Sequence, residues 1–301
     1  MKGHVNSKKK KRQYIGLLYI LPWILGFLIF QLYPFISSFI YSFTNYNMTS
    51  NTEFIGLKNY IDIFTKDSQF YNSLKVTIFY VFMAVPMKLI FALIIAMILN
   101  IKLKYVNFYR TIYYLPSILG GSVAVAVLWR FLFADSGLVN EILSFFGIPK
   151  IGWLSNPKIA LFTISLLTVW QFGSSMVIFL AGLKQIPKEL YEAATVDGVS
   201  KAGMFFTITL PLLTPIILFN LIMQMIIAFQ EFTGSFVITN GGPMKSTYLY
   251  AMKLYDEGFL FMKMGYASAL SWVLFTVILV CTALIFKSSE YWTYYEDGGQ
   301  Y

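Results

Sequence analysis

The fold is decided by an apolar run that reads VTIFYVFMAVPMKLIFALIIAMILN from Val76 to Asn100, in which Lys88 is the single charged residue. A helix must offer about 20 predominantly apolar residues to cross the hydrocarbon core of a bilayer. This run meets that length with one charged interruption. It therefore predicts a helix that spans a membrane.

Five further stretches of similar length and composition occur along the chain. One lies within Gln13–Thr52, which holds no charged residue, and the polar end of that stretch places the end of its helix near Phe43. The sequence therefore predicts an all-α integral membrane protein with six transmembrane helices. The other four stretches are Thr111–Phe133, Ile159–Leu183, Ala202–Gln230 and Met264–Phe286.

The composition agrees with a lipid environment. Hydrophobic residues make up 57% of the 301 residues and charged residues 12%, whereas soluble domains are about 25% charged. The net charge of +9 is compatible with nucleic-acid binding, but a cluster of basic residues lies directly before the first apolar stretch, as in membrane proteins. A single cysteine, Cys281, excludes an intramolecular disulfide, and a single histidine, His4, excludes histidine-based metal sites and a Ser-His-Asp triad.

The distribution of basic residues predicts the orientation of these helices. Lys and Arg are concentrated in a tail at 1–12 and recur in the loops at 101–110 and 184–201, all on one side of a six-helix topology. Cytoplasmic loops carry an excess of these residues. We therefore expect both termini in the cytoplasm and the protein in the cytoplasmic membrane. One transmembrane domain, residues 13–287, then lies between the tail at 1–12 and a cytoplasmic tail at 288–301.

The loop at 184–201 is the most informative part of the sequence, and it reads GLKQIPKELYEAATVDG from Gly182 to Gly198. Pro187 suits the first turn of a helix, and Gly198 suits its C-cap. Small apolar residues and acidic residues between them predict a short amphipathic helix that docks into a groove on another protein. The alternative is a helix on lipid headgroups, which usually carries bulky apolar and basic residues. The apolar face consists of Leu190, Ala193 and Ala194, and the acidic residues are Glu189 and Glu192.

The spacing of residues in this loop resembles a known motif. Glu192-Ala193-Ala194, then Gly198, then Ile208–Pro211 match the EAA loop of permeases from ATP-binding-cassette (ABC) importers. The resemblance extends from about residue 14 to residue 287 and is closest to the carbohydrate, maltose-type branch, without the extra helices and large outer domain of its best-known member. Segments similar to that branch are Leu21-Pro22-Trp23 with Tyr33-Pro34, Phe54–Tyr60 and Thr239–Pro243.

The resemblance implies a permease subunit that forms half of the translocation pathway for a sugar, and among sugars an oligosaccharide. An extracytoplasmic solute-binding protein would deliver the sugar, and a second, similar permease and two cytoplasmic ATPase subunits would complete the importer. The loop at 184–201 would be a coupling helix seated in an ATPase subunit, with Glu192 as a polar anchor and Gly198 as a turn. The expected ATPase-coupling residues are Glu192, Ala193, Ala194, Asp197 and Gly198.

The chain itself is not expected to be an enzyme. It contains no Gly-x-x-x-x-Gly-Lys-Ser/Thr sequence, which cradles the phosphates of ATP in P-loop ATPases. ATP and Mg²⁺ are therefore expected to be used by the partner ATPase, with no cofactor or metal on this chain. The adjacent acids Asp256 and Glu257 are the best candidates for a membrane-embedded enzyme, but solvated loop charges explain them better.

Polar residues within the predicted spans are candidates for a sugar path, because they are costly to expose to lipid and turn inward. Three of them, at helical offsets of 0, 4 and 11, share one narrow stripe of the fifth span. The alternative for all of them is hydrogen bonding between helices, and for the lysine an ion pair or a contact with the partner permease. The candidates are Asn220, Gln224 and Glu231 on the stripe, Trp170 and Gln171 on the fourth span, and Lys88 on the second.

A stand-alone secondary transporter or channel would favour an acidic residue for ion coupling inside the spans and inverted repeats. Spans one and four to six contain no clear internal acid, and no internal repeat is evident. The small residues at Gly120–Ser122 are expected to allow close helix packing and not to form a site.

Overall fold

The computed structural model describes residues 19–47, 52–101 and 104–294. The basic tail at 1–12 therefore lies outside the described residues, as does the end of the C-terminal tail from residue 295. The described residues form helices, and one isolated β-bridge pairs Thr44 with Phe54 among them. The predicted all-α class is confirmed.

Four continuous helices of the described chain are long and apolar enough to cross a membrane, and two further pairs of helices are bent. Counting each bent pair as one span gives the six predicted spans. The continuous helices are Tyr19–Tyr41, which ends in α2 (Tyr33–Tyr41), α4 (Ser68–Asn100), Lys201–Phe229, and α14 (Met264–Ser289). The bent pairs are α5 (Val106–Leu119) with α6 (Val123–Leu132), and α8 (Ala160–Trp170) with α9 (Gly173–Leu183).

The two bends differ from the uninterrupted third and fourth spans that we expected. The axes of α5 and α6 meet at 100°, and those of α8 and α9 at 50°. Gly120 and Gly121 separate the first pair, and the Ser122 hydroxyl accepts a hydrogen bond from the Ala124 amide to start α6 (3.2 Å). Adjacent glycines weaken a helix because they expose its backbone and gain no side-chain packing. Counting apolar residues reveals the length of a span but not such a break.

Shorter elements connect the spans. The helix Lys201–Phe229 is built of α11 (Lys201–Met204), the π-helical turn η2 (Phe205–Thr209) and α12 (Leu210–Phe229). The π-helical turn η1 (Leu28–Leu32) lies within the first helix. The elements between the spans are α3 (Lys58–Thr65), α7 (Leu138–Phe145), α10 (Lys188–Val196), η3 (Ser235–Thr239), α13 (Tyr250–Tyr255) and η4 (Asp256–Leu260).

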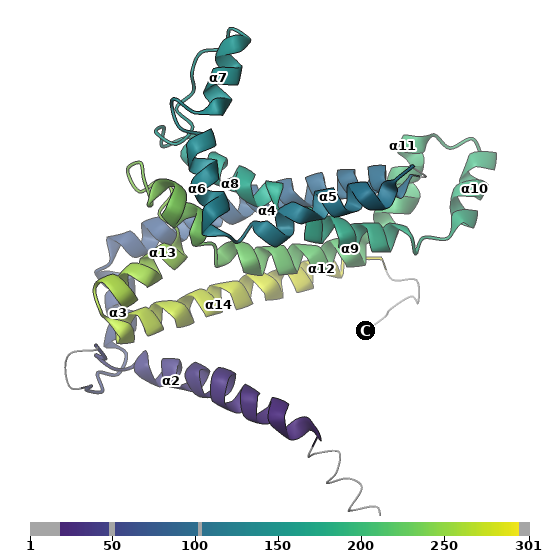
Figure 1. Cartoon of the computed structure of the whole chain (residues 1–301). Coiled ribbons are helices and arrows are strands. Elements are labelled where there is room, and N and C mark those ends of the chain that lie inside the picture. The colour runs from purple at the N-terminus through teal and green to yellow at the C-terminus, as the bar shows by residue number, and fades with distance from the viewer. Residues whose placement is uncertain (1–18, 48–51, 102–103, 295–301) are drawn as a thin grey trace, which may run out of the picture. The chain divides into compact units, whose positions relative to one another are not determined.

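The chain divides into two compact units, Met1–Lys66 with Leu254–Val273, and Asp67–Lys253 with Leu274–Tyr301. In the larger unit α4 is central and packs against α8, α9 and α12, while α5 packs against α9 (Figure 1). Ala84, Ala92 and Ala96 of α4 are completely buried. Small side chains allow helices in a membrane to approach closely.

In the smaller unit, the first span packs against the start of α14. The Trp272 ring lies 4.8 Å from the Phe35 ring and 4.7 Å from the Phe39 ring, and its indole N–H donates to the Ser38 hydroxyl (3.3 Å). Gly265 donates its amide to the Tyr46 carbonyl (2.8 Å). A Cβ at Gly265 would collide with the Thr44 carbonyl oxygen, so this approach requires glycine.

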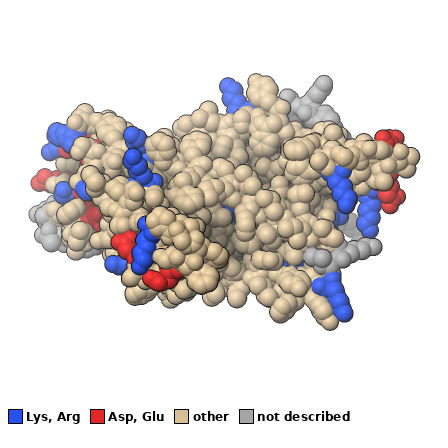
Figure 2. All heavy atoms as spheres, turned by 90° about the horizontal axis from the view of Figure 1, so that it is seen from above, with Lys and Arg blue, Asp and Glu red and all other residues tan. Residues whose placement is uncertain are grey.

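The surface agrees with a membrane environment. Figure 2 shows a wide uncharged area on one face of the molecule, with Lys, Arg, Asp and Glu side chains gathered outside it. Large apolar side chains are exposed along the spans, including Phe82 of α4 and Phe30 of the first helix, which are 75% and 78% exposed. A monomeric soluble protein rarely exposes so much contiguous apolar surface. Lipid is the natural solvent for this surface.

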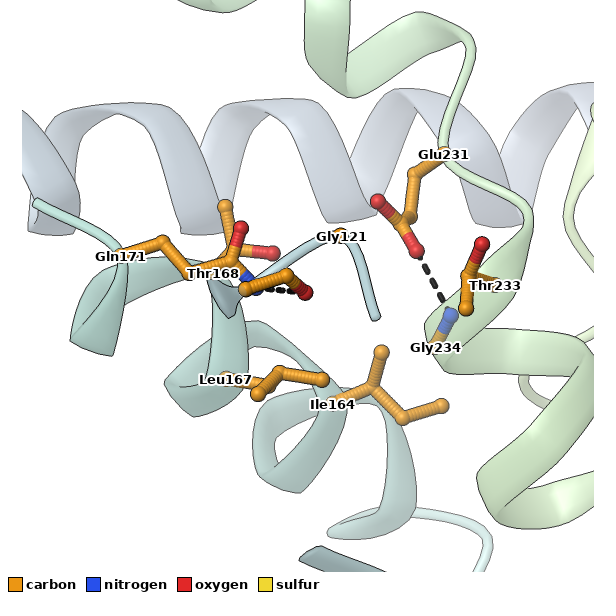
Figure 3. A pocket seen from close by; sticks show the side chains of 9 residues that line it. Gly121, Ile164, Leu167, Thr168, Gln171, Glu231, Thr233 and Gly234 are labelled. Atoms are coloured by element: carbon orange, nitrogen blue, oxygen red, sulfur yellow. Dashed lines mark hydrogen bonds between the residues drawn. The ribbon is translucent and has the colours of Figure 1, made fainter. Parts of the chain in front are cut away.

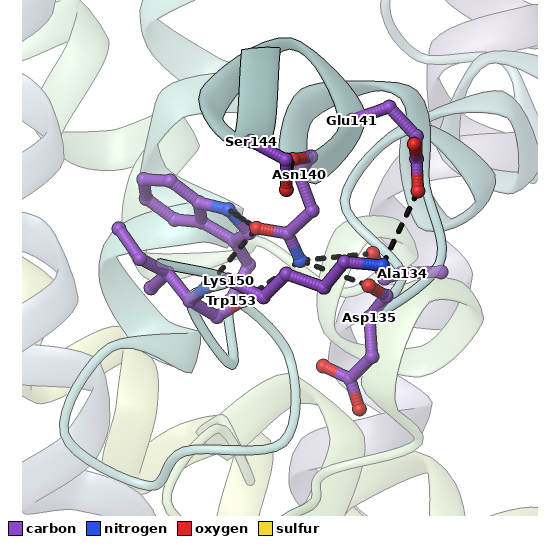
Figure 4. A network of polar contacts seen from close by, with 8 residues as sticks. Ala134, Asp135, Asn140, Glu141, Ser144, Lys150 and Trp153 are labelled. Atoms are coloured by element: carbon purple, nitrogen blue, oxygen red, sulfur yellow. Dashed lines mark hydrogen bonds and ion pairs between the residues drawn. The ribbon is translucent and has the colours of Figure 1, made fainter. Parts of the chain in front are cut away.

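A hairpin between α6 and α8 is organised around one asparagine, Asn140, which is completely buried (Figure 4). Its side-chain amide donates to the carbonyls of Asp135 (3.1 Å) and Ile151 (3.0 Å), and its side-chain oxygen accepts from the Ile151 amide (3.0 Å) and the Trp153 indole (3.2 Å). These hydrogen bonds hold α7 and the segment that follows it in one arrangement. Without Asn140 the hairpin would leave several backbone groups unsatisfied.

A buried ion pair stabilises the start of α4. The Lys253 ammonium lies 2.7 Å from Asp67 Oδ2, and the Lys253 side chain is 2% exposed. The other oxygen of Asp67 caps α4 by accepting a hydrogen bond from the Phe70 amide (3.0 Å). Burial raises the pKa of the nearby Tyr250 phenol, and the charge of Asp67 raises it further. Asp67 therefore acts as both a helix cap and a counterion.

We predict that Lys253→Ala destabilises the protein, because Asp67 would lose its buried counterion. Removing one partner of a buried ion pair costs about 3 kcal/mol or more. Lys66→Ala is the matched control, since Lys66 pairs with Asp62 but its side chain is 70% exposed, and such surface pairs contribute little. Thermal unfolding of the protein purified in detergent measures both variants. Equal unfolding midpoints for the two would contradict the prediction.

Candidate functional site

The first candidate site is the loop that contains α10, and its helix is confirmed at Lys188–Val196. Pro187 stands at the N-cap, one position before the first turn that we predicted for it. Gly198 has a φ of +76°, and the amides of Gly198 and Val199 donate to the carbonyls of Thr195 (3.1 Å) and Ala194 (2.9 Å). This pair of bonds is a Schellman motif, which requires a left-handed residue directly after the cap. The chain therefore reverses sharply at Gly198.

The residues of α10 divide into an inner and an outer set. Ala194 is buried against the rest of the chain, and the Tyr191 hydroxyl shares a hydrogen bond with the Thr209 hydroxyl of η2 (2.8 Å). The predicted apolar face is therefore split, because Ala194 packs inward while its neighbours face outward. The outer set combines acidic and apolar side chains: Glu189, Leu190, Glu192, Ala193, Val196, Asp197 and Gly198 are all exposed.

The second candidate site is a cavity of ≈ 60 Å³ in the larger unit, where three interruptions of helical structure meet (Figure 3). The first interruption is the glycine pair between α5 and α6, the second is the bend between α8 and α9, and the third follows the end of α12. Non-helical backbone at membrane depth is tolerated where it is buried in protein or lines a cavity. The lining residues are Gly120, Gly121, Ile164, Leu167, Thr168, Gln171, Glu231, Thr233 and Gly234.

Two of the sequence candidates, Gln171 and Glu231, line this cavity. Glu231 Oε1 accepts a hydrogen bond from the Gly234 amide (2.7 Å), and Figure 3 shows the other carboxylate oxygen pointing away from Gly234. Gln171 donates its side-chain N–H to the Gly120 carbonyl (2.9 Å). Lys88 of α4, which is 5% exposed, interacts electrostatically with Glu231 but forms no ion pair with it within 4 Å. The cavity therefore combines a carboxylate, an amide and a nearby ammonium group.

The remaining candidates lie elsewhere on the same bundle. Asn220 and Gln224 are buried on α12, as the predicted stripe requires, but α12 ends at Phe229, so Glu231 is not part of that helix. Neither polar atom of the Asn220 side chain has a hydrogen-bond partner in the described chain. Trp170 is half-buried, and its ring lies 6.1 Å from the ring of Trp129.

Sequence reasoning missed the residues that shape the cavity. Gly120 and Gly121 were expected only to allow close packing, and Thr233 and Gly234 were not considered. Thr168 lines the cavity and shares a hydrogen bond of 2.6 Å with the Tyr80 hydroxyl. Adjacent glycines inside an apolar run are a known signal of a helix break, and that signal was present at Gly120. The turn after α12 carries no comparable signal beyond Gly234.

The chain is similar to known transport proteins along almost its whole length. Residues 63–292 match the family described as "Binding-protein-dependent transport system inner membrane component". The chain is 50% identical to the probable ABC transporter permease protein YesP of Bacillus subtilis, with 96% of this chain and 94% of YesP covered. It is 34% identical to the trehalose/maltose transport system permease protein MalF of Thermococcus litoralis, with 97% and 99% covered.

A solved structure has the same fold. A chain of a bacterial alginate ABC transporter, in complex with an alginate pentasaccharide-bound periplasmic protein, superposes with a TM-score of 0.80 and 24% identity over 94% of this chain and 96% of that chain. The family match and the two relatives confirm the family expected from the EAA loop. The chain belongs to the binding-protein-dependent ABC transporter permeases, and it is a multi-pass component of the cytoplasmic membrane.

Proposed function

We propose that this permease forms half of the translocation pathway of an oligosaccharide importer. A second, similar permease supplies the other half, an extracytoplasmic solute-binding protein delivers the sugar, and two cytoplasmic ATPase subunits use ATP and Mg²⁺ to drive transport. The observation that carries the proposal is the geometry of α10, an exposed acidic and apolar helix closed by the Schellman motif at Gly198. The similarity to the trehalose/maltose transport system permease protein MalF of Thermococcus litoralis supports a sugar as the substrate.

The contacts of α10 explain how movement of a docked ATPase reaches the bundle. The Schellman motif fixes the turn after α10, and the Tyr191–Thr209 hydrogen bond ties α10 to η2. η2 continues directly into α12, which ends at Phe229, two residues before Glu231. A displacement of α10 is therefore passed along one continuous helix to the cavity. The translocation pathway would adopt two conformations with different affinities for the ATPase. Such a difference is required to couple ATPase docking to a change in the pathway.

The orientation follows from the same proposal. A cytoplasmic ATPase requires α10 on the cytoplasmic side, and this agrees with the excess of basic residues in the loops at 101–110 and 184–201. Both termini are then cytoplasmic, and the hairpin around Asn140 faces the side of the binding protein.

The polar groups of the bundle are proposed as the sugar path. Glu231 keeps one oxygen for a sugar hydroxyl, and Lys88 is a further buried polar group of the same bundle. Asn220 and Gln224 are buried in this conformation, and the unpaired amide of Asn220 would gain partners when sugar or water enters. Trp170 offers an aromatic surface, although Trp129 already covers part of it. Gln171 contributes to the wall through its bond to Gly120.

Replacing Glu192 by lysine is predicted to release the ATPase, because the reversed charge lies in the exposed acidic surface of α10. The chain is tagged in its native cells, and its co-purifying partners are quantified by mass spectrometry. We expect the recovered ATPase to fall about tenfold or more, the effect of losing one charged hydrogen bond. Glu141→Lys is the control, since Glu141 is an exposed glutamate on a different helix, α7.

Retention of the ATPase by Glu192→Lys at the level of Glu141→Lys would show that α10 is not the docking helix. A wild-type chain that purifies without any ATPase would overturn the importer assignment and favour a secondary transporter.

Glu231→Gln is predicted to weaken sugar-dependent turnover, because a neutral amide replaces the carboxylate that faces the cavity. The measurement is ATPase activity of the complex with its binding protein, stimulated by a panel of neutral and acidic oligosaccharides. We expect stimulation by the active sugar to fall about tenfold. Gln230→Leu is the adjacent control, since Gln230 is exposed and bonds to the Ile226 carbonyl of its own helix (3.0 Å). Equal stimulation in the two variants would remove Glu231 from the path.

A further inference from the structure

The two bent spans are joined at their breaks by hydrogen bonds that each break supplies to the other. The Ser117 hydroxyl of α5 donates to the Gln171 carbonyl (3.1 Å) and accepts from the Ser174 amide (3.0 Å). In return the Gln171 side chain donates to the Gly120 carbonyl (2.9 Å). Broken helices leave backbone groups that must find partners at membrane depth. Here a side chain of one break satisfies the backbone of the other.

The glycines at both breaks are required for this contact. A Cβ at Gly120 would collide with the Gln171 side chain, and a Cβ at Gly173 would lie 2.6 Å from the Tyr113 carbonyl oxygen and 2.8 Å from the Ser117 hydroxyl. Gly121, one residue further, has open space around it. Between Gly120 and Gly121, glycine is therefore required only at the position that touches the other break.

The contact between the two breaks lies at the wall of the cavity, so separating the two bent spans there would enlarge the cavity. Gly120 and Gln171 both line it, and the carboxylate of Glu231 lies across it (Figure 3). Water or sugar hydroxyls in the cavity are able to replace these hydrogen bonds, so exchanging them costs little free energy. The interior of the bundle around α4 is different, because its apolar contacts have no such replacement. The breaks are thus a polar join between the two bent spans that water or sugar hydroxyls are able to replace.

We propose that Ser117 and Gln171 form a latch that holds the two bent spans together while the pathway is closed and that releases in each transport cycle. The inference rests on the proposed function, since it takes the cavity as part of the pathway. Gln171 is then a gating residue whose amide acts on the neighbouring span, and its contact with sugar is secondary.

The test locks the latch with a disulfide. Ser117→Cys and Ser174→Cys are combined with Cys281→Ser, which removes the single native cysteine. The Ser117 hydroxyl oxygen lies 3.0 Å from the Ser174 amide nitrogen, so the two residues are direct neighbours across the contact. The whole complex is purified with its ATPase, and diamide accepts the two electrons and two protons of the thiols. Blocking of free thiols with a maleimide reagent reports how much disulfide has formed.

We expect the disulfide to form readily in the nucleotide-free complex and to form about tenfold less in the complex trapped with MgATP and vanadate. Once formed, it should reduce ATPase activity about tenfold, and a reducing agent should restore that activity. The two single-cysteine variants, treated in the same way, control for oxidation of the ATPase subunits.

A disulfide that forms equally in both nucleotide states and leaves ATPase activity unchanged would identify the contact as a permanent brace and overturn the latch. If the disulfide forms in neither state, Gly120→Ala decides, and basal ATPase activity equal to that of the wild type would overturn the latch. Failure of the proposed function gives a different result, since no ATPase would co-purify with the wild-type chain. Gly120→Ala supplies a second measurement, because its Cβ should displace Gln171 and raise basal ATPase activity, whereas Gly26→Ala, at a glycine of the first helix with open space around it, should not.

Discussion

Every carbonyl and amide of a chain in lipid must find its partner within the protein, because the bilayer core offers no water to bond them. This constraint explains why the described chain is helical and why its exceptions are informative. Where α5 and α8 stop short, side chains close the gap, as Ser117 does for Gln171 and Gln171 for Gly120. The third interruption, after α12, is closed by Glu231, which accepts from the Gly234 amide.

The same constraint separates rigid from adaptable parts of the bundle. Completely buried alanines on α4 allow neighbouring helices to pack directly on its backbone, and such contacts resist change. The interruptions instead gather polar groups around a cavity. At the other end of the helix Lys201–Phe229, which Glu231 follows by two residues, α10 is fixed to η2 by the Tyr191 hydroxyl. A stiff helix therefore separates an exposed docking surface from a polar, adaptable centre.

The sequence was sufficient for features that depend on local pattern. Apolar length predicted the spans, and the proline and glycine around α10 predicted a helix that the structure confirms at Lys188–Val196. It was insufficient where partners are distant. Gln171 bonds to Gly120, 51 positions away, and no local pattern reveals that pairing. Asn140 was also missed, because a single buried asparagine leaves no periodic signal although it organises a hairpin.

The ion pair between Asp67 and Lys253 has a consequence for the order in which the protein is made. Asp67 begins α4, whereas Lys253 is translated only after α4, both bent pairs and α12. The carboxylate that caps α4 must therefore remain hydrated at the membrane surface while these helices are inserted. Desolvation of Asp67 becomes favourable only once Lys253 arrives. The larger unit is thus completed late in biosynthesis, and a nascent chain that stops before α13 still displays an unneutralised acidic group to cellular quality control.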